Sequence, residues 1–381
     1  MSEINSSNFK KEHGDLAPDL VGVTELTSPY FFVPPSGDTA SRPEDCEPGT
    51  LRFNTDIGSL EIFRGKLMGW EQIQRRERQY LGGGTGSNTG TGTRATFSGG
   101  HDPGYSNIID YFTIPTFGNA QDFGNLTAGR SASGDLGSRT RGLKGGGYTG
   151  SNSDIIDFWT FSSTGDAVDF GNLAAAVHWT QPSSSETRGL WAGGNNPGNS
   201  NRIEYITISS TGNAVDFGDL LTGQSVGANS SMQSTTRGFF GGGTPTLQNV
   251  IEFVTTATLG NSADFGDATT QFAREGRGSN ATRGLFLGGT RAEPSSQNIV
   301  DFITMATLGN AIDFGDMTTA IKDSAAAASP TRIICAHGNA PGTVNTVDFI
   351  EISTTGNAAD FGDLTDARDH LGGCSNGHGG L

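Results

Sequence analysis

A repeat of about 47 residues constrains this chain more than any other feature. The tetrapeptide Asp-Phe-Gly-Asn/Asp occurs six times in the 381 residues. Its aspartates are Asp122, Asp169, Asp216, Asp264, Asp313 and Asp360. A period of 40–50 residues is typical of a structural unit that is stacked several times, because a single unit of that size cannot bury its own apolar face.

Two further columns repeat with this tetrapeptide. The arginines of a Thr-Arg pair are Arg94, Arg141, Arg188, Arg237, Arg283 and Arg332, and the acidic residues of an apolar-rich run are Asp110, Asp157, Glu204, Glu252, Asp301 and Asp348. These two columns either pack one unit on the next or form rings around an axis, where they pair with one another or present charge to a ligand. Repetition favours packing, since a ligand site usually breaks symmetry.

The Asp-Phe-Gly motif is itself predicted to be structural. Its aromatic residues, Phe123, Phe170, Phe217, Phe265, Phe314 and Phe361, are expected in the core of each unit. The glycine suits a strained turn or a bulge, and the aspartate suits a capping or inter-unit hydrogen-bond acceptor. A protein-kinase reading fails, because no His-Arg-Asp loop or Val-Ala-Ile-Lys strand accompanies the motif.

The fifth unit illustrates the expected local structure. Residues 283–287 form a short apolar run that ends at paired glycines, and residues 298–304 alternate as strands do. Gly309 and Asn310 suggest a tight hairpin turn, followed by a strand with Ile312 and Phe314. With the Ser/Thr/Ala-rich stretch after each motif, every unit has about four strands.

Four short antiparallel strands in each of six units predict an all-β chain with a six-bladed β-propeller. Residues 364–381 match the strand that opens a unit and then stop, so they are predicted to complete the first blade. The repeat also resembles the Kelch family, in which a strand ending in Gly-Gly precedes a strand with an aromatic residue. Here that residue is the phenylalanine of Asp-Phe-Gly, and the tryptophan usual in the family is absent.

The first 75 residues fall outside the repeat. Residues 1–45 are predicted to be an extended arm, 46–75 a small β-meander, 76–92 a glycine-rich linker and 93–381 the propeller. The stretch Gly82–Gly90 lacks the Lys-Ser/Thr of a phosphate-binding loop, so a linker is the favoured interpretation.

The N-terminal region carries a second resemblance. The pattern GTLRFNTDIGSLEIFRG followed by GWEQI is similar to a short β module of tailed-phage virion proteins. With SPYFFVPPSG and QYLGGGTGSNTGTGTR, the whole chain resembles repeat-bearing structural proteins of contractile-tailed phages (myoviruses) of marine cyanobacteria. This resemblance implies a virion protein of the tail, baseplate or fibre. Arg52, Phe53, Phe63 and Trp70 are the candidate anchoring residues, although the module could bury its three aromatic rings in its own core.

Composition narrows the function classes. The net charge of −16 and the absence of a basic patch argue against nucleic acid as a partner. No leader-like apolar stretch and no run of about 18 apolar residues occurs, so membrane insertion is not expected. The three cysteines are too scattered for a disulfide framework or a zinc site. The six histidines show no common register and are expected at the surface, so neither a metal, a cofactor nor a catalytic residue is predicted.

Recognition is expected in the variable loops that follow each Gly-Gly strand, since binding residues concentrate on loops of a rigid scaffold. These loops span residues 101–107, 148–154, 195–201, 244–249, 290–298 and 337–345, and they should lie on one face. The candidate ligand residues are Tyr105, Tyr148, Asn195, Gly198 and Asn339.

The leading hypothesis is a non-enzymatic structural protein of a phage particle, anchored by its N-terminal region to other virion proteins. Two alternatives remain open: a capsid decoration protein, and a receptor-binding module for host-surface polysaccharide. A glycan and further copies of the chain are open as partners. An enzyme would need a converging carboxylate pair in one blade only, whereas the acids repeat in all six.

Overall fold

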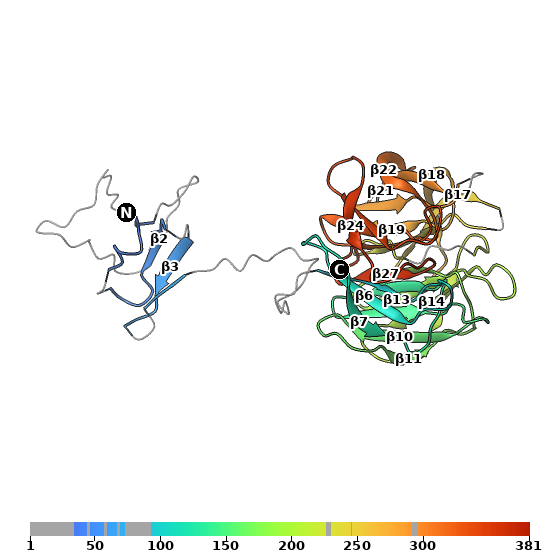
Figure 1. Cartoon of the computed structure of the whole chain (residues 1–381), viewed down its shortest axis with the longest axis horizontal. Helices are drawn as coiled ribbons and strands as arrows, with labels where there is room; N and C mark the ends of the chain where they lie inside the picture. The colour runs from blue at the N-terminus through green and yellow to red at the C-terminus, as the bar shows by residue number, and fades with distance from the viewer. Residues whose placement is uncertain are drawn as a thin grey trace, which may run out of the picture. The chain divides into compact units, whose positions relative to one another are not determined.

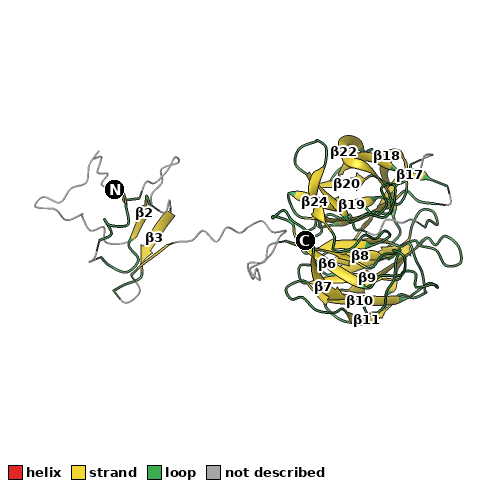
Figure 2. Cartoon of the chain, in the orientation of Figure 1, coloured by secondary structure: helices red, strands yellow, loops and turns green. Residues whose placement is uncertain are grey.

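The computed structural model describes residues 34–43, 46–56, 59–66, 69–72, 93–225, 230–244, 246–291 and 296–381. They divide between two compact units, residues 1–78 and 79–381. All regular elements of the described residues are strands, with no helix among them (Figure 2). The predicted all-β class is therefore confirmed. The predicted linker 76–92 and most of the arm 1–45 lie outside the described residues.

The N-terminal unit contains one four-stranded sheet. Its strands are β1 (Ser36–Gly37), β2 (Leu51–Asn54), β3 (Ser59–Phe63) and β4 (Trp70–Gln72). Strands β2, β3 and β4 pair antiparallel in chain order, as the meander prediction requires, whereas β1 pairs parallel with β2 and was not predicted. The buried Glu61 carboxylate holds this small unit together by accepting hydrogen bonds from Arg42 and Asn54.

The C-terminal unit consists of antiparallel sheets in a propeller-like arrangement (Figure 1). Five sheets have four strands. From the first strand to the last in each sheet, they are β27 (Gly372–Ser375), β5 (Arg94–Ser98), β6 (Ile108–Thr113) and β7 (Gln121–Asn125); β8 (Gly134–Gly137), β9 (Arg141–Gly145), β10 (Ile155–Thr160) and β11 (Val168–Asn172); β12 (Gln181–Ser184), β13 (Arg188–Ala192), β14 (Arg202–Thr207) and β15 (Val215–Asp219); β19 (Gly276–Ser279), β20 (Arg283–Leu287), β21 (Gln297–Thr304) and β22 (Ile312–Ile321); β23 (Ala325–Ala328), β24 (Arg332–Ala336), β25 (Thr346–Glu351) and β26 (Ala359–Asp363).

The remaining sheet, fourth in chain order, has three strands in the described residues: β16 (Arg237–Gly241), β17 (Gln248–Thr255) and β18 (Ala263–Phe272). Beside β16, the place of a fourth strand is taken by an isolated antiparallel bridge between Gln233 and Gly238, and residues 226–229 before it lie outside the described residues. The amide of Gly241, at the inner edge of β16, donates to Gln181 Oε1, and its carbonyl accepts from Arg277. Side chains from two other sheets thus supply hydrogen bonds to this edge residue.

The strand β27 pairs antiparallel with β5, so the last strand of the chain completes the first sheet, as predicted (Figure 1). The tail beyond it lies at the C-terminal ends of the first strands of several sheets. His378 Nε2 donates to the Gly137 carbonyl at 2.7 Å, and the Gly379 amide donates to the Ser279 carbonyl. These contacts tie the tail to the second and fifth sheets.

Apolar residues are buried between neighbouring sheets, because each strand presents one side to each neighbour. One cluster joins Phe97 and Phe112 of the first sheet to Ile334 and Phe361 of the sixth.

The tight turn predicted in the fifth unit is wrong. Seven residues separate β21 from β22, and of the Gly309-Asn310 pair only Gly309 has a positive φ, at 155°. A two-residue hairpin of the expected type needs positive φ at both central positions.

Candidate binding site at the loop face

The repeated arginines join each sheet to the next. Arg141 Nη1 donates to the carbonyl oxygen of Ile208 at 2.7 Å, and its guanidinium lies 4.7 Å from the centre of the Phe158 ring. The same pair of contacts recurs at Arg94, Arg188, Arg237 and Arg283. Arg332 differs, since it pairs with Glu351 and stacks on Phe117 and Phe349.

The repeated acidic residues are buried and also join neighbouring sheets. Asp157 accepts from the amide and hydroxyl of Thr127 at 3.1 and 2.7 Å and from Arg130 at 2.9 Å. Asp110 makes the same three contacts with Thr365 and Arg368, which joins the first sheet to the segment after the sixth. None of the six repeated arginines pairs with these acids among the described residues, so the paired-ring alternative is wrong.

In the Asp-Phe-Gly motif, the predicted roles of the phenylalanine and the glycine are confirmed, and that of the aspartate is wrong. The six phenylalanines are buried, and each sheet has a register shift at the motif, which confirms the predicted core residue and bulge. A Cβ at Gly124 would lie 2.4 Å from the carbonyl oxygen of Gly165 in the next sheet. The six aspartates are exposed, and the predicted inter-sheet acceptor is instead the Asn or Asp of the next turn, as where Asp166 accepts from the Asn125 amide at 2.9 Å.

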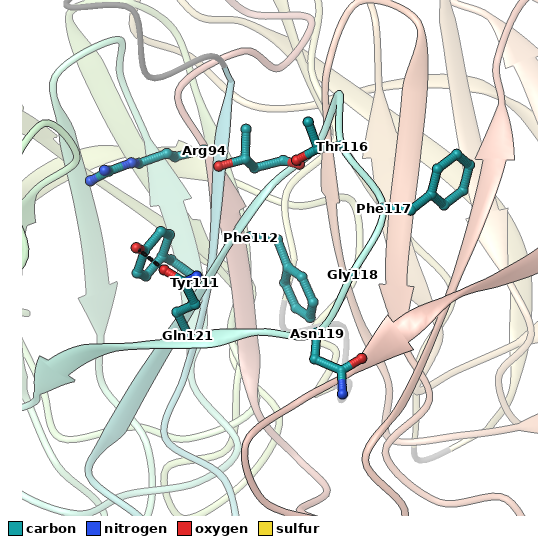
Figure 3. A pocket seen from close by; sticks show the side chains of 9 residues that line it. Arg94, Tyr111, Phe112, Thr116, Phe117, Gly118, Asn119 and Gln121 are labelled. Atoms are coloured by element: carbon teal, nitrogen blue, oxygen red, sulfur yellow. Dashed lines mark hydrogen bonds between the residues drawn. The ribbon is translucent and has the colours of Figure 1, made fainter.

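A pocket of about 480 Å³ lies at the turn between β6 and β7 (Figure 3). Figure 3 shows Arg94 and Phe117 on opposite sides of it, pointing away from each other. Its two main polar side chains already have partners, because Arg94 Nη1 donates to the Phe161 carbonyl and the Tyr111 hydroxyl bonds to Gln121. We therefore assign the residues of this pocket to packing.

A strained backbone occurs where the chain enters the first strand of a sheet. Five residues in equivalent positions have left-handed backbone angles although none is glycine; we call them the αL ring. They are Ala132, Trp179, Arg274, Asp323 and His370, with φ of 53°, 58°, 61°, 53° and 53°. Such angles cost free energy for residues with a Cβ, and they concentrate at functional sites.

Backbone hydrogen bonds connect the αL ring from sheet to sheet. The Asp323 amide donates to the Arg274 carbonyl, the His370 amide to Asp323, the Ala132 amide to His370 and the Trp179 amide to Ala132, at 2.7 to 3.0 Å. The guanidinium of Arg274 lies 5.4 Å from the centre of the Trp179 ring. These shared bonds hold all five residues in the strained conformation.

The predicted loops lie at the same end of the sheets as the αL ring. Their first residues pair with the residues that precede the ring: His101 with Asp369, Tyr148 with Ser131, Asn195 with His178, Thr244 with Ser225, Thr290 with Ala273 and Asn339 with Lys322. We call this end the loop face. Residues 245 and 292–295 of two loops lie outside the described residues.

Aromatic side chains gather on one part of the loop face around a pocket of about 470 Å³, which we call the aromatic basin. It is lined by His101, Tyr105, Ser131, Ala132, Tyr148, His178, Trp179, Asp369 and His370. The rings follow one another: Tyr105 to Tyr148 at 5.9 Å between centres, Tyr148 to His178 at 5.3 Å, and His178 to Trp179 at 4.7 Å. The basin therefore spans loops and strand entries of the first three sheets.

His370 carries a positive charge in this setting. Its Nε2 lies 3.1 Å from Asp323 Oδ1 and its Nδ1 lies 2.9 Å from Asp369 Oδ1. Burial lowers the pKa of His370, but hydrogen bonds to both carboxylates outweigh burial and raise it to about 9. Burial likewise opposes ionisation of Asp323, while the hydrogen bond and charge of His370 lower its pKa below the ordinary value. The charges of Arg274 and Lys322 also lower the pKa of Asp323.

Burial lowers the pKa of His178 and so favours its neutral form. The amide nitrogen of Asn152 donates to the Asn195 carbonyl, which orients the Asn152 oxygen toward His178 Nδ1, 2.7 Å away. Nδ1 therefore donates to this oxygen, and Nε2 of the neutral imidazole is left as an acceptor.

Of the predicted ligand residues, the structure brings Tyr105 and Tyr148 together and leaves the others apart. Asn195 contributes its backbone to the position of His178 but does not line the basin. Gly198 has open space around it, and Asn339 pairs with Lys322 in the sixth unit.

Trp179, Asp369 and the histidines of the basin were not predicted as site residues. His101 lies in the predicted loop 101–107, whereas His178, Trp179, Asp369 and His370 lie before the first strand of a unit and outside the predicted loops. The register of these residues, directly before the first strand of each unit, was the available signal. The expected surface position of every histidine is wrong for His337 and His378, which are buried, and His13 lies outside the described residues.

The candidate anchoring residues lie together in the N-terminal unit, partly turned inward. Arg52 and Phe63 are buried, whereas Phe53 and Trp70 are half-buried. Arg52 donates to the Asp38 carbonyl and lies 5.7 Å from the Trp70 ring centre, and Phe63 lies 5.5 Å from Trp70. Arg52 and Phe63 therefore stabilise the unit, and Phe53 and Trp70 offer the exposed area.

Among the described residues, no group of three or more His, Cys, Asp and Glu side chains is placed to hold a metal. The cysteines Cys46, Cys335 and Cys374 are unpaired with one another. Within the described part of the chain there is no helix long and apolar enough to cross a membrane.

No protein-family model matches the sequence, and no curated protein matches it significantly.

Proposed function

We propose that this chain is a non-enzymatic structural protein of a phage particle, in which the N-terminal unit attaches to other virion proteins and the repeat unit is displayed. The C-terminal unit acts as a six-bladed Kelch-like propeller, with β27 closing the first blade. The tail, baseplate or fibre is the proposed location, and decoration of the capsid is the alternative.

The observation that supports this proposal most is the use of the repeated charged residues. The acids bind neighbouring sheets, and five of the six repeated arginines bind backbone carbonyls of the next sheet. Catalysis by a carboxylate needs a group that faces a substrate, and these acids are buried against protein partners. A scaffold built in this way favours a display role over an enzymatic one.

Localisation on intact particles tests the proposal. Antibody labelling, or fitting of the propeller into a cryo-EM map of the particle, should find the protein at the tail, baseplate or fibre. Density over the head would make it a decoration protein, and absence from the particle would overturn the virion assignment.

Deletion of residues 1–75 tests the division of labour. The truncated chain should keep the β-sheet circular dichroism of the repeat unit and lose incorporation into particles. Full incorporation of the truncated chain would show that the N-terminal unit is not the anchor. Leu221→Ser, an exposed apolar position of the repeat unit, is the matched control and should be incorporated normally.

A second function, adhesion to host-surface polysaccharide, is favoured by the aromatic basin. Tyr105 is 39% exposed, and it lies beside a pocket instead of in a core. Exposed aromatic groups beside a concave surface are typical of ligand sites. The display role and the adhesive role are compatible in one particle protein.

A further inference from the structure

The aromatic basin breaks the symmetry of a unit that is otherwise regular. The position of Tyr148 holds Asn or Thr in four other units, and that of Tyr105 holds Asn152, Asn199 and Thr343. Polar residues there satisfy the fold equally well, so packing gives no reason for tyrosines at these two positions. Aromatic residues at this one sector therefore indicate a ligand.

The shape of the basin fits a flat ring or a short chain of rings. Its volume of about 470 Å³ is in the range of small-molecule pockets, and successive rings along it are tilted by 50° to 70°. The rings follow one another as a row across neighbouring units. A row offers several faces to an extended ligand, whereas a cage for a single methylated ammonium group surrounds one point.

The charges of the basin favour a neutral ligand. Asp369 is already paired with His370 at 2.9 Å, and His370 is shared with Asp323. Asp323 also lies 3.5 Å from Arg274. Because the carboxylate and the cation that line the basin, Asp369 and His370, are paired with each other, neither an anionic nor a cationic ligand finds an unpaired opposite charge on this lining.

The polar groups match hydroxyl-rich ligands. Nε2 of the neutral His178 is an acceptor, and the hydroxyls of Tyr105 and Tyr148 have no hydrogen-bond partner within the described part of the chain. A sugar ring presents C–H groups on its faces for aromatic contact and hydroxyls at its edge that both donate and accept.

We propose that the aromatic basin binds an uncharged hexopyranose of an oligosaccharide, with Tyr105 and Tyr148 contacting the sugar faces and His178 accepting a hydrogen bond from a sugar hydroxyl. This inference deepens the adhesive role proposed above. It assigns the ligand class and the sector of the loop face, and it concerns no covalent step.

Isothermal titration calorimetry of the full chain tests the proposal. The probes are neutral hexasaccharides of β-1,4-glucose, α-1,4-glucose, β-1,4-mannose and β-1,4-galactose, with a chitosan hexamer and a hexagalacturonate as the cationic and anionic probes. At least one neutral probe should bind, and more tightly than either charged probe. Absence of binding by every neutral probe overturns the proposal, as does tighter binding of a charged probe.

Variants place the binding in the basin. Tyr148→Ala should weaken binding of the best neutral probe about 10-fold, and Tyr148→Phe should keep it within about 3-fold, because the ring face is retained. Phe117→Ala is the control, since Phe117 is an exposed ring at the pocket between β6 and β7 (Figure 3). This variant should bind the probe like the parent chain. Equal affinity of the parent and Tyr148→Ala chains, both with unchanged circular dichroism, would overturn the site.

This test separates the inference from the virion proposal, because it uses the free protein. A chain that binds neutral sugar through Tyr148 but is absent from particles supports the site and refutes the location. A chain found on the tail that binds no neutral sugar refutes the site and leaves the location intact.

Discussion

The joints between sheets and the loop face use the same repeated backbone in opposite ways. At the joints, Asp110 and Asp157 are buried and make the same contacts with partners of equivalent position. At the loop face, the backbone of the αL ring is equally regular, but its side chains are alanine, tryptophan, arginine, aspartate and histidine. Regular side chains mark packing, and varied side chains on a regular, strained backbone mark recognition.

Joint residues should therefore determine stability, and loop-face residues should determine binding. Asp157→Ala should have the largest effect, a loss of about 3–5 kcal/mol in the free energy of unfolding, because Arg130 is left buried without its anion. Chemical denaturation monitored by tryptophan fluorescence measures this loss.

Asp169→Ala is the matched control, since Asp169 belongs to the repeated motif but is exposed. Its unfolding free energy should change by less than about 0.5 kcal/mol. Similar losses in both variants would mean that repetition, and not burial at the joint, predicts the energetic role.

The glycine of the Asp-Phe-Gly motif should have the next largest effect. A Cβ at Gly315 would lie 2.4 Å from the Gly356 carbonyl oxygen of the next sheet, so Gly315→Ala should cost about 1–3 kcal/mol. Gly356→Ala has open space and should cost less than 1 kcal/mol, about the intrinsic difference between the two residues. Thermal unfolding of both variants checks the difference, and equal melting temperatures would contradict a close approach at this joint.

The two histidines on either side of β27, His370 and His378, should have the smallest effect. Together they should give the free energy of unfolding a maximum near pH 6.5. The pKa of His370 is raised to about 9, so its contribution is full below about pH 6.5 and is lost as pH rises toward 9. Burial lowers the pKa of His378 to about 4, so its contribution is present above about pH 6.5 and is lost as pH falls toward 4.

The free energy of unfolding should fall by about 1–2 kcal/mol on the acid limb and on the alkaline limb of this pH profile. Melting temperatures from pH 4 to 9 measure both limbs. His370→Gln should flatten the alkaline limb and His378→Gln the acid limb, each without changing the other. A parent profile that keeps rising up to pH 9 would contradict the charged state of His370 in the αL ring.

The sequence predicted those parts of the fold that depend on local pattern. The strands around Arg283 and Asp301 and the core positions of the repeated phenylalanines follow from apolar alternation and period. The hairpin turn at Gly309 was misjudged, because a Gly-Asn pair suits several turn lengths. Strand β1 was missed, since the two residues of Ser36–Gly37 carry no apolar pattern and pair through their backbone.

The candidate site was only partly predictable for a different reason. Tyr105 and Tyr148 stand out because they are aromatic in polar loops. Trp179 and His370 come from strand entries, and Trp179 lies 31 residues after Tyr148 in the sequence. Only the sheet-to-sheet hydrogen bonds of the αL ring bring such residues together, and non-glycine residues with positive φ leave no sequence signature.

The pairing of β27 with β5 also has a consequence in time. Thr96 and Cys374 contact each other although 278 residues separate them in the sequence. At ordinary rates of protein synthesis, β5 waits about 14–56 s for its partner, with one edge unpaired. During that interval the unpaired edge is open to other strands, including those of a second nascent chain. Within the repeat unit, the sheet that is begun first is therefore the last to be completed.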